Sequence, residues 1–305
     1  MATTANPVAT VPKTTSIGCS VPSENLIIRG IAFWHLLSLD APSVAVLWTW
    51  FLARINYIPL PPTAILAMGI AVWMLYAADR LLDTRSLPSN PPFEGIHAEL
   101  ELRHHFHRHH QKFFRWAILL SSISLAVLLP GLAPQSIRLY LALGTLLMGY
   151  FAIIHAGFGV HRAAHRLPKE LAVGAFFSAA TFIPTVSRNP ALRAALFPGA
   201  ILFAALCSLN CLFIYAWEHP STSPQAHFAT RIALRFLPTL TISVMGIGLL
   251  LSVTDHSLPR PIPLSCAIAA LLLLLLHKNS HRFAPTTLRA AADICLLTPF
   301  LLLRL

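Results

Sequence analysis

The chain has 305 residues, of which 56% are apolar and 11% are charged, whereas an ordinary soluble domain carries about 25% charged residues. This composition excludes a soluble globular protein and a disordered chain. Since about 20 apolar residues cross a bilayer, it predicts an all-α polytopic membrane protein. The net charge is +11, but the basic residues lie between apolar runs, so they report membrane topology and do not indicate a nucleic-acid partner.

The chain divides into two parts. Residues 1–30 are rich in Thr, Pro, Ser and Ala and lack the apolar core of a signal peptide, which predicts a flexible cytoplasmic tail. Residues 31–305 are predicted to form a nine-helix transmembrane domain whose loops are marked by proline and glycine. The expected membrane spans are residues 32–53, 61–83, 114–132, 136–157, 168–187, 193–217, 232–253, 262–277 and 286–303.

The basic residues orient these nine spans. With the N-terminus in the cytoplasm, 16 Lys and Arg residues fall on the inner side and six on the outer side. This asymmetry satisfies the positive-inside rule. We therefore expect an integral multi-pass protein with a cytoplasmic N-terminus, in the inner membrane if the protein is bacterial.

Ionisable residues near the spans gather at the cytoplasmic side. Asp79 and Asp83 end the second expected span, Lys169 and Glu170 open the fifth, and Glu218 ends the sixth. The two aspartates are four residues apart and share one helical face, where their like charges repel. A Mg²⁺ ion held by both carboxylates would offset that repulsion, although a solvated helix end is the simpler interpretation.

A second polar pair lies on the sixth span. Asn210 and Glu218 are eight residues apart, which is roughly two helical turns, so they share a face. An amide two turns inside an apolar helix requires a hydrogen-bond partner or a ligand. A contact with a neighbouring helix would satisfy Asn210 as well as a ligand would.

These features resemble the UbiA superfamily of intramembrane prenyltransferases, over about residues 30–303. That family has nine membrane helices and two Asp-rich motifs, on its second and sixth helices. Asp79 and Asp83 match the aspartates of the first motif, and Leu75 stands where the family has asparagine. In the second motif Asn210, Ile214 and Glu218 occupy positions four apart where two aspartates are usual.

The resemblance implies a UbiA-like helical bundle that transfers an isoprenyl group from a diphosphate to a lipophilic acceptor, with Mg²⁺ as cofactor. The lipid bilayer and these two substrates are then the partners. It implies catalytic roles for Asp79, Asp83 and Lys169, and a metal site of Asp79, Asp83 and Glu218. The expected substrate-binding residues are Tyr76, Arg80, Arg166, Asn210 and Glu218.

Two other functions stay open. The altered second motif allows a non-catalytic superfamily member that binds a lipid. A run of histidines within the loop 84–113 includes His105, His109 and His110, and its spacing resembles one box of the membrane di-iron oxygenases. An amphipathic helix lying on the cytoplasmic face is the favoured explanation of this loop.

Several polar residues remain inside expected spans. His35 and Asp40 lie five residues apart in the first span, and Asp293 lies in the ninth. Buried polar groups of this kind usually satisfy each other across helices. Asp293 has no complementary charge nearby in sequence, and a proton or substrate path through these groups is the remaining alternative.

Overall fold

A computed structural model describes residue 30 and residues 33–83, 109–155, 169–219 and 227–303. These residues form helices joined by turns and contain no strand, which confirms the all-α prediction. The tail 1–29 and most of the loop 84–113 lie outside the described residues. The α-helices are α2 (Asp40–Ile55), α3 (Pro62–Asp83), α5 (Gln111–Leu128), α6 (Pro134–His155), α7 (Lys169–Arg188), α8 (Leu192–Glu218), α9 (Phe228–Arg235), α10 (Leu237–Thr254), α11 (Pro261–Lys278), α12 (Pro285–Cys295) and α13 (Pro299–Leu302).

Six helices in the described part of the chain are long and apolar enough to cross a membrane. They are Pro62–Leu81, Gln111–Gly131, Lys169–Arg188, Leu192–Glu218, Leu237–Thr254 and Pro261–Lys278. Each falls on an expected span, with bounds that differ by a few residues. The largest difference is at the seventh, where residues 232–235 belong to the separate short helix α9 and Leu237 starts α10. The prediction of nine spans is not confirmed.

The first and last expected spans are interrupted. One helical turn over residues 33–36 is separated from α2 by a break in which Ser38 has a positive φ of 60°. The break lies four residues before Pro42, whose ring would clash with the carbonyl of residue 38 in a continuous helix. The last span is split into α12 and α13, and Pro299, which has no N–H to donate to the carbonyl of Cys295, begins α13.

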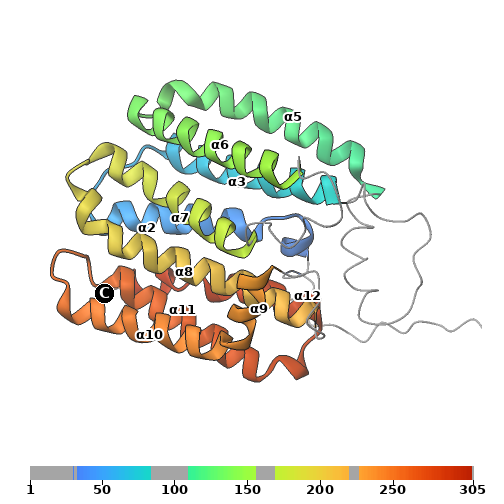
Figure 1. Ribbon diagram of the computed structural model, residues 1–305. Helices are drawn as coiled ribbons and strands as arrows, with labels where there is room; N and C mark the ends of the chain where they lie inside the picture. The colour runs from blue at the N-terminus through green and yellow to red at the C-terminus, as the bar shows by residue number, and fades with distance from the viewer. Residues whose placement is uncertain (1–29, 31–32, 84–108, 156–168, 220–226, 304–305) are drawn as a thin grey trace, which may run out of the picture.

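The helices run in alternating directions and pack around α8, which contacts α7, α10, α11 and α12 (Figure 1). The core is built around Trp48, Phe203 and Phe213, each fully buried. The Trp48 indole N–H donates a hydrogen bond of 2.8 Å to the carbonyl of Leu296, which lies in the break after α12. The interruption of the last span therefore supplies the acceptor that fixes this tryptophan in the core.

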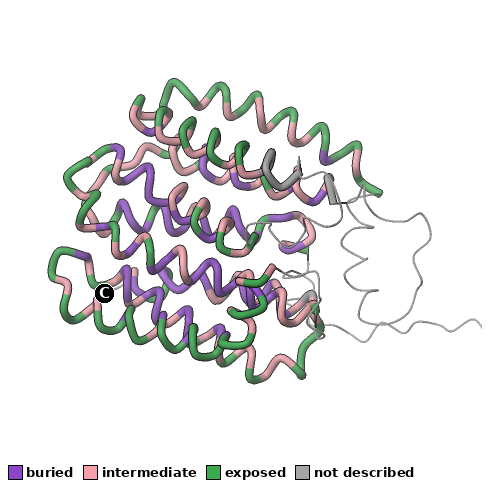
Figure 2. Tube along the Cα trace, viewed as in Figure 1, coloured by how far each residue is buried: buried purple, intermediate pink, exposed green. Residues whose placement is uncertain are grey.

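The outer helices present apolar side chains to the surroundings. In α5 only Phe114 is buried, and Trp116, Leu120 and Ile123 are exposed. Figure 2 shows the same pattern over α10, with buried residues concentrated in α2, α7 and α8. A continuous apolar surface of this extent suits lipid rather than water, so the fold is that of a helical membrane protein.

The closest helix contact is between α7 and α8, and it depends on a glycine. A Cβ atom added at Gly174 would lie 2.5 Å from the carbonyl oxygen of Ala204 and would also collide with the Ser208 hydroxyl. One turn further along α7, the Ser178 hydroxyl donates a hydrogen bond of 2.7 Å to the carbonyl of Ala200. Small residues thus bring the two backbones together, as is common in membrane bundles.

We expect Gly174→Ala to destabilise the protein by about 1–3 kcal/mol, since a backbone carbonyl must move to accept the methyl group. The matched control is Gly246→Ala on the outer face of α10, where an added Cβ meets nothing within 4 Å. Alanine there should be neutral or slightly stabilising, because it favours the helix. Thermal unfolding in detergent tests both variants, and equal melting temperatures would contradict the close packing.

Candidate functional site

Polar residues gather at one end of the bundle. Because the helices alternate in direction, the end of α3, the start of α7, the end of α8 and the start of α12 lie at the same end (Figure 1). We call this the polar end and define it by Asp79, Lys169, Glu170, Glu218 and Arg289. Four of these five residues were expected to lie together on one side of the membrane, and Arg289 is added by the structure.

The predicted residues Asp79 and Lys169 are neighbours. The Lys169 ammonium nitrogen lies 3.8 Å from Oδ1 of Asp79, although the residues are 90 positions apart in the sequence. The Asp79 side chain is 42% exposed and the Lys169 side chain is 62% exposed, so the pair contributes little to stability. It is instead accessible to a charged ligand, with one anionic and one cationic group side by side.

The other predicted polar residues already have protein partners. Glu218 Oε1 accepts a 2.5 Å hydrogen bond from Arg289 in α12. The Asn210 amide N–H donates to Oδ1 of Asp293, also in α12, at 2.8 Å. Both contacts go to the same helix, as the shared face of Asn210 and Glu218 predicted. The structure thus joins the predicted residues in pairs. Asp79 contacts Lys169 of α7, whereas Glu218 contacts Arg289 of α12.

Arg80 is buried in the bundle, whereas its sequence neighbour Asp79 is partly exposed. Arg80 is 5% exposed, and its guanidinium donates to the carbonyl of His35 at 2.8 Å and to the Ser38 hydroxyl at 2.7 Å. A third contact, at 3.3 Å, reaches Oδ2 of Asp40. Arg80 therefore satisfies the groups freed by the break before α2. The expectation that it binds substrate is untested by these contacts.

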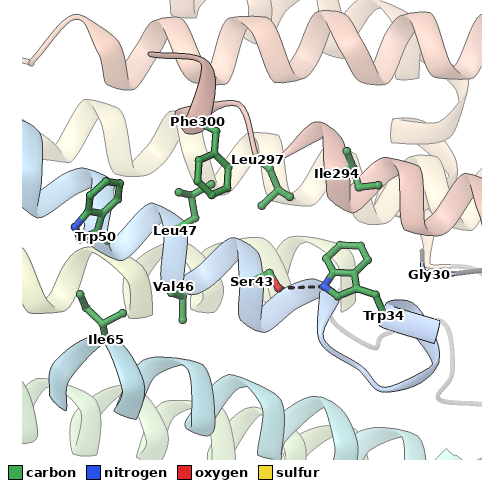
Figure 3. Close-up of a pocket in the computed structure, with 10 residues that line it drawn as sticks. All are labelled: Gly30, Trp34, Ser43, Val46, Leu47, Trp50, Ile65, Ile294, Leu297 and Phe300. Atoms are coloured by element: carbon green, nitrogen blue, oxygen red, sulfur yellow. Dashed lines mark hydrogen bonds between the residues drawn. The ribbon is translucent and has the colours of Figure 1, made fainter. Parts of the chain in front are cut away.

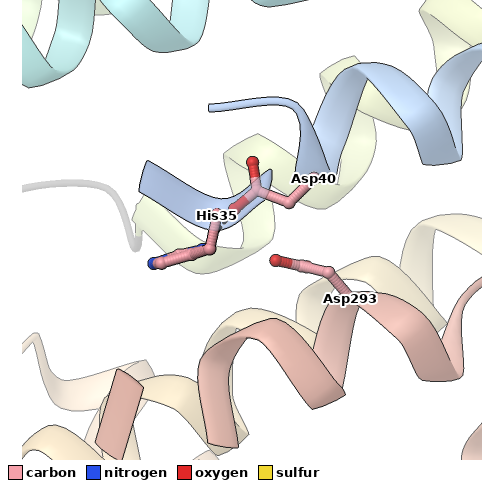
Figure 4. Close-up of side chains that lie close together, drawn as sticks. All are labelled: His35, Asp40 and Asp293. Carbon is pink, nitrogen blue, oxygen red and sulfur yellow. Dashed lines mark hydrogen bonds and ion pairs between the residues drawn. The ribbon is translucent and has the colours of Figure 1, made fainter. Parts of the chain in front are cut away.

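A second set of polar residues is buried inside the bundle, at the break before α2. The His35 ring nitrogen Nδ1 is 2.6 Å from Oδ2 of Asp40, which confirms that these two residues satisfy each other. Figure 4 shows the Asp293 carboxylate directed from α12 toward this pair. We call the five residues His35, Asp40, Arg80, Asn210 and Asp293 the buried polar cluster.

The sequence identified His35, Asp40 and Asp293 as polar residues within spans, but it did not predict that the three lie close together. Arg80 and Asn210 were instead expected at the substrate site. The signal that could have joined them is the break caused by Pro42, since an interrupted helix exposes carbonyls that require a buried donor. Arg80 is the donor that α3 provides.

Tyr76 lies near the buried polar cluster, since its hydroxyl is within electrostatic range of Asp40 and Asp293. Tyr76 packs on the small apolar group of Ala41, Ala45, Met68 and Val72. Asp83 is the last residue of α3, but its side chain is not described. Arg166 lies outside the described residues. Of the histidine run, only His109 and His110 are described. His277 accepts a hydrogen bond from the indole N–H of Trp217.

An apolar groove runs along α2 and has a volume of about 730 Å³. Figure 3 shows Trp50 and Leu47 of α2 facing Leu297 and Phe300 at the end of the chain, with Ile65 of α3 on the other side. At one end of the groove, the Trp34 indole N–H donates to the Ser43 hydroxyl at 3.1 Å. Ile294, the neighbour of Asp293, also lines the groove.

Fold and site together define a helical membrane protein with one polar end and a buried polar cluster. Comparison of the chain with protein-family models, with curated proteins and with solved structures gave no significant match.

Proposed function

We propose that this protein is a UbiA-like intramembrane prenyltransferase with nine membrane-crossing helices and a cytoplasmic N-terminus. It would move an isoprenyl group from a diphosphate donor to a lipophilic acceptor. The observation that carries the proposal is the pair of Lys169 and Asp79, 3.8 Å apart and accessible at one end of an apolar bundle. A carboxylate can bind the metal ion of a metal-bound diphosphate, and a basic residue can contact its phosphate oxygens.

The donor atoms at the polar end suit Mg²⁺, which prefers one or two carboxylates together with phosphate oxygens and water. Asp79, Asp83 and Glu218 are the residues that would hold it. Mg²⁺ supplies Lewis-acid stabilisation of the departing diphosphate when it is bound. Arg289 contacts Oε1 of Glu218, so Oε2 is the oxygen that we propose for the ion.

The protein's own cations would stabilise the charge that develops on the leaving group. Lys169 is 62% exposed and can turn from Asp79 toward a phosphate oxygen, where a fixed positive charge is most effective. Arg289 lies at the same end of the bundle through its pair with Glu218. Arg166, three residues before Lys169, is the further cation that we propose for this role.

The apolar groove offers a place for the isoprenyl chain. Its lining is almost entirely aliphatic and aromatic, with Trp34, Trp50 and Phe300 among its walls. A chain lying there removes apolar surface from water or from disordered lipid. The groove is open along its length, which suits a substrate that enters from the bilayer.

One observation favours the second candidate, a non-catalytic lipid-binding protein. Asn210 and Glu218, which replace the second Asp-rich motif, are already bound to Asp293 and Arg289. In that case the groove would bind a lipid chain without any metal-dependent step. Whether binding depends on Mg²⁺ separates the two candidates.

We expect purified protein to bind geranylgeranyl diphosphate only when Mg²⁺ is present. The variant Asp83→Ala should bind it at least about 10-fold more weakly, because it loses a carboxylate of the proposed metal site. The matched control is Asp255→Asn, which changes a carboxylate held by Ser257 in the turn after α10. Equilibrium binding of radiolabelled ligand to detergent-solubilised protein measures all three.

Two results would contradict the enzyme proposal. Binding that is independent of both Mg²⁺ and Asp83 favours the lipid-binding candidate. No binding at all excludes both the enzyme and the lipid-binding candidate. Consumption of the diphosphate in step with modification of an acceptor from a membrane lipid extract would exclude the non-catalytic candidate.

A further inference from the structure

The buried polar cluster contains a set of metal-ligand atoms in a compact arrangement. One ring nitrogen of His35 and one carboxylate oxygen from each of Asp40 and Asp293 lie within 4.8 Å of one another. Within the described residues, this is the group of three or more His, Cys, Asp and Glu side chains close enough to share an ion. The three residues come from two segments that are more than 250 positions apart, and the core fixes their positions.

The charges of the cluster are not balanced. Asp40 and Asp293 supply two negative charges and Arg80 supplies one positive charge. Arg289, one turn before Asp293 in α12, is itself paired with Glu218. His35 and Asp40 are only 3% and 2% exposed, so an excess negative charge at this depth is costly unless a cation or a proton offsets it.

An independent observation comes from Asn210, which is 5% exposed. Its amide nitrogen donates to Oδ1 of Asp293 at 2.8 Å, but its amide oxygen has no hydrogen-bond partner among the described residues. Leaving a buried acceptor unsatisfied costs about 1–3 kcal/mol. This amide is in contact with the cluster, and a cation beside Asp293 would give its oxygen a partner after rotation of the amide.

We propose that His35, Asp40 and Asp293 form a binding site for a divalent transition-metal ion, with the Asn210 oxygen as a fourth ligand. One imidazole nitrogen with two carboxylates suits Zn²⁺, Mn²⁺ or Fe²⁺. Mg²⁺ prefers oxygen ligands. The site is therefore chemically distinct from the Mg²⁺ site proposed at the polar end, and it does not depend on the prenyltransferase function.

The existing contacts can rearrange to accept the ion. His35 binds as a neutral imidazole whose proton moves to the other ring nitrogen, so its hydrogen bond with Asp40 is exchanged for two metal bonds. Arg80 reaches Asp40 at 3.3 Å but holds Ser38 and the His35 carbonyl at 2.7 and 2.8 Å. The long contact is the weaker one, and Arg80 keeps its place without it.

The test uses Co²⁺ and Mn²⁺ as probes on the full-length protein, purified in detergent and freed of metal with a chelator. We expect about one tightly bound Co²⁺ per chain, measured from its visible absorption bands. Asp293→Asn should weaken this binding by at least about 10-fold. Asp255→Asn is the control, and it should bind Co²⁺ as the wild type does.

A second variant covers the case in which Asp293→Asn does not fold. His35→Gln keeps a polar side chain but removes the imidazole, so the coupling of ¹⁴N to bound Mn²⁺ in pulsed electron paramagnetic resonance should disappear. The proposal is overturned if folded wild type binds neither ion. It is also overturned if Asp293→Asn or His35→Gln binds metal with the affinity and the spectrum of the wild type.

Discussion

Replacing Arg80 with methionine is expected to lower the free energy of unfolding by about 3–5 kcal/mol, the range for removing one partner of a buried ion pair. The variant leaves Asp40 with one cation fewer in a site that is 2% exposed. It also removes the donor to the His35 carbonyl and the Ser38 hydroxyl. Because methionine fills nearly the same volume, the loss reports the charge and the hydrogen bonds rather than a cavity.

The midpoint of unfolding in a denaturing detergent measures this effect. Arg115→Met is the matched control, since Arg115 is exposed and contacts only Gln111 at 3.3 Å among the hydrogen bonds of the described chain. Adding Asp40→Asn to Arg80→Met should recover part of the lost stability, because the unpaired carboxylate is then neutral. A loss below about 1 kcal/mol for Arg80→Met would show that Arg80 does not secure the break before α2.

The positions of the long helices could be predicted because membrane spans depend on local composition. The fifth expected span, residues 168–187, corresponds to Lys169–Arg188, and the eighth, residues 262–277, corresponds to Pro261–Lys278. An apolar run long enough to cross lipid must be helical, since its backbone groups have no other partner there. Proline and glycine at the loops then limit where each helix ends.

The two interrupted spans could not be predicted from composition. Residues 32–53 and 286–303 are as apolar as a span requires, and their breaks depend on contacts from other helices. Arg80 and the Trp73 indole of α3 bond the groups freed before α2, and Trp48 bonds the carbonyl freed after α12. A proline allows a break, but a donor from elsewhere in the fold is required to stabilise it.

The site was predictable to the extent that helix direction determines it. Alternating directions placed Asp79 and Lys169 at one end, and the structure makes them neighbours. Helical spacing gave Asn210 and Glu218 a common face, and both contact α12. Their partners Asp293 and Arg289 could not be deduced, because no periodicity indicates which helix packs against that face.

Replacing Lys169 with glutamine is expected to lower the rate of isoprenyl transfer by about 10²–10³-fold, the range for removing one preorganised electrostatic contact to a developing negative charge. This result depends on the proposed prenyltransferase function. Stability should change by less than about 1 kcal/mol, since the Lys169–Asp79 pair is largely exposed. Release of diphosphate from geranylgeranyl diphosphate, with a membrane lipid extract as acceptor source, measures the rate.

The size of the loss alone does not separate binding from chemistry, so kcat and KM are measured separately. A cation that acts mainly on the departing diphosphate lowers kcat, whereas one that only holds the bound substrate raises KM. Lys169→Arg keeps the charge and should retain most of the rate, and Lys112→Gln, at the exposed start of α5, controls for loss of a surface charge. Normal turnover in Lys169→Gln would separate the Lys169–Asp79 pair from catalysis and leave the proposed function without the contact on which it rests.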